Sequence, residues 1–200
     1  MRRLASFSLA LAAGLLPAAL ACAHPGHDPD PSHVHPFAEG LLHPLFGIDH
    51  LLAMLAVGLL AGRAGGRAAW LLPAAFLAAM SLGGALSAAS VHVPWVEYGI
   101  VASVAAFGLV IALARKAPLR AVLPIVAGFA VLHGWAHMAQ LPAAASALAY
   151  SGGFLLTTAS LLVGGVALGL ALRRGASQRS FRYAGGAIAA CSLLILAGWL

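Results

Sequence analysis

The sequence predicts an all-α membrane protein, a bundle of six transmembrane helices that follows a cleaved signal peptide. Of the 200 residues, 62% are hydrophobic and only 8% are charged, whereas soluble domains carry about 25% charged residues. The chain also contains six apolar runs of about 20 residues, the length that crosses a bilayer. Apart from Arg2 and Arg3 at the N-terminus, its basic residues occupy only alternate connections between these runs.

Residues 1–23 are typical of a signal peptide. Arg2 and Arg3 form a short positive region, an apolar stretch follows, and Ala21-Cys22-Ala23 fits the small-x-small cleavage pattern. Cleavage there makes His24 the mature N-terminus and leaves one cysteine, which has no partner for an internal disulfide. Two alternatives remain open, a lipoprotein site at the first cysteine and an uncleaved first helix.

Residues 24–36 form a His-rich segment that we expect on the periplasmic side. Its prolines keep it extended rather than helical, and its histidines can capture a divalent metal ion. Cleavage before the first histidine would add the α-amine as a further ligand, and an inert polar linker is the alternative. The candidate ligands here are His24, His27, His33 and His35.

Residues 37–200 form the predicted transmembrane domain. Glycines recur in the apolar runs, as in Gly58-x-x-x-Gly62 and Gly165-x-x-x-Gly169. In lipid, small residues allow two helices to pack backbone to backbone, so this pattern favours a membrane bundle. The six predicted spans are 37–62, 68–90, 95–114, 119–141, 148–172 and 182–200.

The basic residues orient the spans. Positively charged loops stay in the cytoplasm, so we expect the mature N-terminus in the periplasm and the protein in the bacterial inner membrane. Despite a net charge of +6, nucleic acid is not an expected partner, because the charges form short clusters between apolar runs. The basic residues of the spans and connections are Arg63, Arg67, Arg115, Lys116, Arg120, Arg173, Arg174, Arg179 and Arg182.

Ionisable side chains inside spans are costly and usually functional, and here they are concentrated in the first and fourth spans. In a continuous first helix, His43 and His50 share one face with Glu39, and Asp49 lies about 100° away. We expect Asp49 to face a neighbouring gap or to orient an imidazole. Pro44 removes a backbone donor, which is expected to kink this helix or to free a carbonyl.

In the fourth span, His133 and His137 are one helical turn apart and can present two nitrogens to one metal ion. Antiparallel packing of the first and fourth spans would bring His43 level with both, with Asp49 and His50 lying deeper. Neutral imidazole suits nickel, cobalt, copper and zinc, and a carboxylate adds a harder ligand. The alternative is that each histidine is satisfied separately within the core.

The segment from His43 to Met54 resembles the HupE/UreJ family of nickel permeases, whose first mature span carries an H-x5-D-H pattern, matched here by His43, Asp49 and His50. The segment from Leu132 to Gln140 is similar to a second family motif, F-H-G-x-[AV]-H-G-x-E. Both histidines, the first glycine and the alanine match, whereas the phenylalanine, the second glycine and the glutamate are replaced.

The resemblance implies a permease rather than an enzyme, moving nickel, or alternatively cobalt, into the cytoplasm for metalloenzymes such as hydrogenase or urease. The ion is the transported substrate, and no permanently bound cofactor is expected. The expected path runs from the His-rich segment to His43, His133 and His137, and then to His50 with Asp49. There is no Walker-type motif, so ATP does not drive transport directly, and proton coupling stays open.

The replacement of the family glutamate by Gln140 removes one negative charge, which leaves the identity of the metal open. Glu39 and Glu97 are the candidates to compensate for it.

Two other functions remain open. His50 and His133 could be axial ligands of a haem in a redox membrane protein. The chain could also bind metal without transporting it, as an accessory protein in metalloenzyme maturation, although Asp49 in mid-span favours transport. The expected partners are a divalent metal ion and membrane lipids, while a homo-oligomer and a cytoplasmic metallochaperone stay open.

Overall fold

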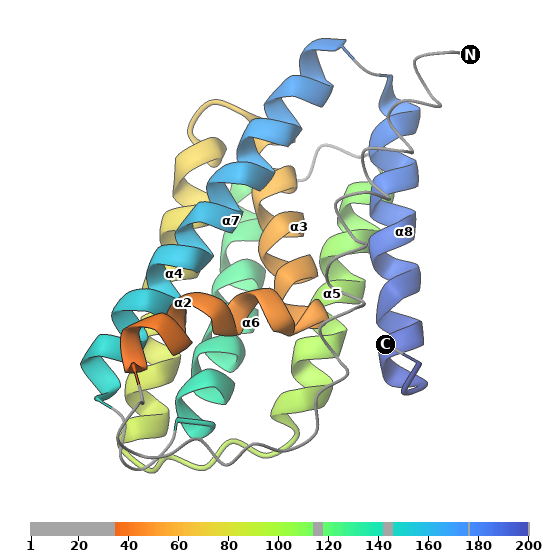
Figure 1. The fold of residues 1–200 in the computed structure, drawn as a ribbon. Helices are drawn as coiled ribbons and strands as arrows, with labels where there is room; N and C mark the ends of the chain where they lie inside the picture. The colour runs from red at the N-terminus through yellow and green to blue at the C-terminus, as the bar shows by residue number, and fades with distance from the viewer. Residues whose placement is uncertain (1–34, 114–117, 142–145, 176, 200) are drawn as a thin grey trace. The chain divides into compact units, whose positions relative to one another are not determined.

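A computed structural model of the chain describes residues 35–113, 118–141, 146–175 and 177–199. The described residues form only α-helices and turns, which confirms the all-α class for this part of the chain. The predicted signal peptide, and His24, His27 and His33 of the His-rich segment, lie outside it. The helices are α2 Pro36–Phe46, α3 Ile48–Ala64, α4 Ala68–Ala88, α5 Val96–Ala112, α6 Leu119–Ala139, α7 Ala147–Gly175 and α8 Gln178–Leu196 (Figure 1).

Three of these helices, α4, α6 and α7, are long and apolar enough to cross a membrane individually. α2 and α3 meet the same criterion as a pair, although they are bent by 79° at the break between them. α5 is a shorter apolar helix of 17 residues, and α8 has 19 residues, with Arg179 and Arg182 near its start. The described residues therefore contain three candidate spans, or four if the bent pair is one span.

The first predicted span is not the continuous helix that was expected over 37–62. It divides at Gly47, whose backbone is extended with φ −86° and ψ 105°. Pro44 lies inside α2 and has no N–H to donate to the carbonyl of Gly40, so α2 is already weakened one turn before the break. α2 consequently lies across the neighbouring helices instead of continuing the line of α3 (Figure 1).

The helices pack mainly in four pairs, α4 with α6, α3 with α7, α5 with α8, and α2 with α7. Glycines bring the backbones of α3 and α7 together. A Cβ added to Gly58 would lie 2.8 Å from the Cα of Gly165, and one added to Gly62 would lie 3.0 Å from the Cα of Gly169. The two glycine patterns identified in the sequence therefore face each other across this interface, as small residues do between helices in lipid.

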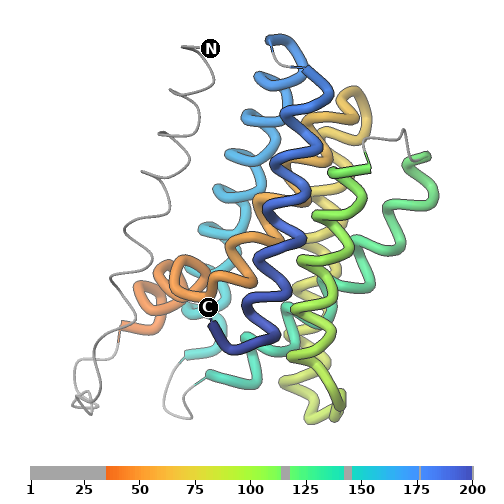
Figure 2. Tube along the Cα trace, turned by 90° about the vertical axis from the view of Figure 1, so that its right-hand side faces the viewer, coloured from red at the N-terminus to blue at the C-terminus, as the bar shows by residue number. Residues whose placement is uncertain are grey.

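Basic side chains connect the helix ends at one end of residues 35–200. Arg63, in the last turn of α3, donates to the carbonyl of Ile111 at 2.9 Å, and its guanidinium carbon lies 5.2 Å from the ring centroid of Phe181 in α8. Arg173 donates to the carbonyl of Ala64 at 3.2 Å. The ends of α3, α5 and α7 and the start of α8 therefore meet on one side (Figure 2).

Candidate metal centre

The four histidines predicted within the spans lie in one continuous row, which we call the histidine row. Its order is His43 from α2, His137 from α6, His50 from α3 and His133 from α6. The ring centroids of successive members are 4.8, 3.9 and 4.9 Å apart. His50, His133 and His137 are buried, and His43 is half-buried. Three helices thus bring four imidazoles into direct contact inside an apolar bundle.

The break at Gly47 determines the order of this row. In a continuous helix, His50 would lie about 10 Å further along the axis than His43. In the structure, α3 begins anew at Ile48, and the His50 ring contacts both His133 and His137. The expected arrangement, with His50 deeper than the other three histidines, is therefore wrong.

A hydrogen-bonded chain runs along the His133 end of the row. Nδ1 of His50 and Nδ1 of His133 are 2.7 Å apart, and Nε2 of His133 is 2.9 Å from Oγ of Ser103 on α5. The Ser103 hydroxyl also donates to the carbonyl of Ile100 at 2.6 Å. Ser103 was not among the predicted site residues, and the sequence signal for it is a hydroxyl in the middle of an otherwise apolar stretch.

Asp49 lies beside the row, in the first turn of α3. Its Oδ1 accepts a hydrogen bond from the backbone N–H of His50 at 2.8 Å, and the same oxygen lies 4.0 Å from Nε2 of His50. Its side chain is 20% exposed. The carboxylate is therefore placed to balance positive charge that arrives at His50.

Both ring nitrogens of His137 are buried and have no hydrogen-bond partner within the described part of the chain. A buried polar group without a partner costs about 1–3 kcal/mol. The ring instead packs on Phe154, with centroids 4.0 Å apart, and on His43, which in turn meets Tyr150 at 5.9 Å. His137 is consequently the member of the row that would gain most from a ligand.

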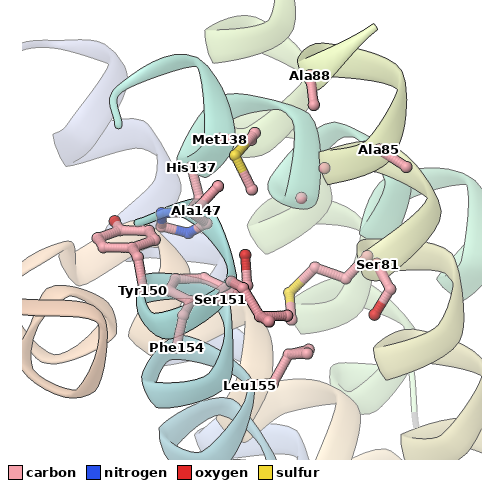
Figure 3. Close-up of a pocket in the computed structure, with 14 residues that line it drawn as sticks. Ser81, Ala85, Ala88, His137, Met138, Ala147, Tyr150, Ser151, Phe154 and Leu155 are labelled. Carbon is pink, nitrogen blue, oxygen red and sulfur yellow. The ribbon is translucent and has the colours of Figure 1, made fainter. Parts of the chain in front are cut away.

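A pocket of about 310 Å³ opens beside His137, between α4, α6 and α7. Its lining is mostly apolar, with hydroxyls from Ser81, Tyr150 and Ser151. Ala88 ends α4 and Ala147 begins α7, so this side of the pocket belongs to the end of the helices opposite the basic side chains. In Figure 3, the rings of His137 and Tyr150 lie next to each other at the wall of the pocket.

The row does not form a closed metal site in the structure. Among residues 35–113, 118–141, 146–175 and 177–199, no three His, Cys, Asp or Glu side chains are grouped so that they could hold one metal ion. The Nδ1 atoms of His50 and His133 face each other at 2.7 Å, so an ion between them would have to part the two rings. Their direct contact also leaves no space for a porphyrin, so the geometry does not favour the haem alternative.

The remaining predicted ligands lie outside the row. His35 is exposed just before α2, Glu39 is half-buried in the first turn of α2, and Glu97 is exposed in the first turn of α5. Gln140 is exposed at the C-terminal cap of α6. Within the described part of the chain, no hydrogen bond or ion pair joins these side chains to the row.

Comparison with known proteins extends the similarity far beyond the two histidine motifs. The chain matches the family described as HupE / UreJ protein over residues 11–195. It is 40% identical over 189 residues to Protein HupE of Rhizobium leguminosarum bv. viciae. The aligned region covers 94% of this chain and 95% of that protein. No solved structure matches the chain. The chain therefore belongs to the HupE/UreJ family of membrane proteins.

Proposed function

We propose that this protein is a permease for a divalent transition-metal ion, nickel with cobalt as the alternative, and that it moves the ion from the periplasm to the cytoplasm. The buried histidine row carries this proposal. Ionisable side chains within apolar helices are costly and are typically retained for a substrate or ion path. Discontinuous helices line such paths in transporters, and the row lies at the break between α2 and α3.

The proposed topology has six spans, the bent pair of α2 and α3 followed by each of α4 to α8. The basic end, where Arg63 and Arg173 connect the helices, is the cytoplasmic end by the positive-inside rule. The start of α2 and the His-rich segment before it are then periplasmic. At 17 residues, α5 is about 26 Å long, and slight thinning of the bilayer accommodates the shortfall.

The pocket beside His137 supports a route for the ion. It lies near the proposed periplasmic end, and its lining includes the imidazole that lacks partners. We propose that the ion, gathered by the His-rich segment, first meets His137 and His43. It then passes to His50 and His133, where Asp49 balances its charge. Each step uses few ligands, so binding is weak enough for the ion to leave again.

The position of Gln140 supports one refinement of this path. It is exposed at the periplasmic end of α6, outside the row. The family glutamate that it replaces would add negative charge at the mouth of the path rather than a ligand within it. We therefore expect Gln140→Glu to change the concentration dependence of uptake more than the preference for one metal.

Uptake of radioactive nickel by cells tests the site. At equal expression, His43→Ala, Asp49→Ala and His50→Ala should lose uptake. His92→Ala is the matched control, because His92 is an exposed histidine outside the row. Wild-type uptake by all three variants would show that the row is not the path.

Proteoliposomes containing the purified protein separate transport from binding alone. Competition among nickel, cobalt, zinc and copper identifies the metal. Binding without any uptake into the vesicles would instead favour the accessory-protein alternative.

A further inference from the structure

We propose that Ser103 is a positioning residue of the histidine row. It holds the His133 imidazole in the tautomer that leaves Nδ1 free for the transported ion. The proposal rests on the proposed function, because it describes how the same site presents its ligands.

The tautomer of His133 follows from counting hydrogens. A serine hydroxyl has one hydrogen, and a carbonyl oxygen can only accept. At 2.6 Å from the carbonyl of Ile100, Ser103 donates its hydrogen there. The 2.9 Å contact between Oγ of Ser103 and Nε2 of His133 is then a hydrogen bond only if Nε2 carries the hydrogen. A neutral imidazole has one N–H, so Nδ1 of His133 carries the lone pair.

The same reasoning extends to His50. Its Nδ1 lies 2.7 Å from Nδ1 of His133. Because the His133 nitrogen carries a lone pair, His50 must donate the hydrogen from its Nδ1. Nε2 of His50 is then unprotonated and lies 4.0 Å from Oδ1 of Asp49, where two acceptors face each other. The metal-free protein therefore has a directed chain of hydrogen bonds that begins at His50 and ends at the carbonyl of Ile100.

An ion bound between the two Nδ1 atoms would take the place of the shared hydrogen. Metal–imidazole bonds of about 2.0–2.1 Å at the right angle typical of tetragonal Ni(II) would separate two nitrogens by about 2.9 Å, so the rings would have to part from their present 2.7 Å. His50 then carries its one N–H on Nε2, after exchange through water with no net gain or loss of protons, and donates it to Asp49. With the ion bound, each ligating ring would then have an acceptor for its other nitrogen, Ser103 for His133 and Asp49 for His50, an arrangement that orients metal-binding imidazoles in general.

Burial makes the serine hydroxyl difficult to replace. Ser103 and His133 are both fully buried, so bulk water does not reach the N–H of Nε2. In Ser103→Ala that N–H loses its acceptor, and the ring can recover a hydrogen bond only by moving its hydrogen to Nδ1. That change would place a hydrogen on the nitrogen that the ion needs as a ligand.

Ser192 provides a matched control. It is also buried, and its hydroxyl also donates to the carbonyl three residues earlier, Ala189, at 2.7 Å. Within the described residues, however, it has no hydrogen bond to an imidazole. Replacing Ser103 or Ser192 with alanine removes the same atoms from a similar environment, and only Ser103→Ala touches the row.

The first measurement is nickel affinity by calorimetry on the purified full-length protein in detergent. Ser103→Ala should weaken nickel binding about 10–100-fold. Ser103→Thr keeps the hydroxyl and should retain most of the wild-type affinity. Ser192→Ala should bind nickel like the wild type. Unchanged binding in Ser103→Ala would overturn the proposal. Equal weakening in both alanine variants would also overturn it, because the effect would then be one of packing.

The second measurement needs neither metal nor transport. Nitrogen NMR of ¹⁵N-histidine-labelled protein distinguishes protonated from bare ring nitrogens, and a His133→Gln sample assigns the signals. Wild-type protein should show N–H on Nε2 of His133, and Ser103→Ala should lose this preference. If the tautomer depends on Ser103 but the wild type transports no ion, the proposed function fails and the positioning role stands. If the wild type transports nickel but His133 has the same tautomer in Ser103→Ala as in the wild type, only the positioning role of Ser103 fails.

Discussion

Gly134 lies on α6 between His133 and His137, at the closest approach of α6 to α4. A Cβ at this position would collide with the carbonyl oxygen of Met80 and would lie 2.6 Å from its carbonyl carbon. That distance is about 0.8 Å inside the 3.4 Å at which ordinary contact begins. Because the obstacle is helix backbone, it cannot rotate away, and Gly134→Ala should force α4 and α6 apart.

The expected cost of this overlap is about 1–3 kcal/mol, the usual range for overpacking. Gly128→Ala is the control on the same helix, because a Cβ on Gly128 would meet nothing within 4 Å. Both substitutions gain the same helix propensity, so the difference in stability between them isolates the overlap. The shift of α6 should also separate His133 from His50, because a hydrogen bond of 2.7 Å does not tolerate a displacement of that size.

Two assays examine these effects. Unfolding by titration of a denaturing detergent, followed by tryptophan fluorescence, compares the stabilities of the two variants. Nickel uptake should fall tenfold or more in Gly134→Ala and stay at the wild-type level in Gly128→Ala. If Gly134→Ala were as stable as Gly128→Ala and took up nickel normally, the close approach of α4 and α6 described above would be refuted.

Three further predictions concern the break at Gly47, the interface between α2 and α7, and a buried hydroxyl beside that interface. Gly47→Ala should weaken nickel binding, because its Cβ would lie 2.8 Å from Cδ2 of His50 and displace the ring; unchanged affinity by calorimetry would show that the ring has room to move. Thr157→Val should lower the free energy of unfolding in detergent by about 0.5–1.5 kcal/mol, because it removes the 2.7 Å hydrogen bond to the carbonyl of Leu41. Thr158→Val, one residue later, should be neutral or stabilising, because that buried hydroxyl has no partner among the described residues; a loss as large as that of Thr157→Val would contradict this distinction.

The limits of most helices could be predicted from the sequence. The runs 68–90 and 119–141 became α4 over Ala68–Ala88 and α6 over Leu119–Ala139. Composition determines these limits, because an apolar run of this length satisfies its backbone most easily as a helix. The prediction fell short where a helix continues past its apolar run, as α7 does through Arg173 and Arg174 to Gly175.

The break at Gly47 could not be predicted with its angle. Pro44 indicated a weak point, but the bend lies three residues later, and its φ and ψ are accessible to any residue. What favours glycine there is space, since a Cβ would meet the ring of His50. That constraint arises only when α2 lies across the bundle, which the sequence does not reveal. The contact of Ser103 with His133 likewise depends on how α5 packs beside α6.

The way the histidines are arranged bears on transport as much as their number does. A structural metal site holds its ion with about four convergent ligands, and such a site retains the ion. In the described part of this chain, four imidazoles are in contact, yet no three metal-binding side chains converge on one point. Under the proposed function, a row that offers two nitrogens at a time, with one carboxylate beside it, would bind an ion at successive positions without trapping it at any of them. The break at Gly47 produces this arrangement, because it places His50 between the two histidines of α6 rather than beyond them.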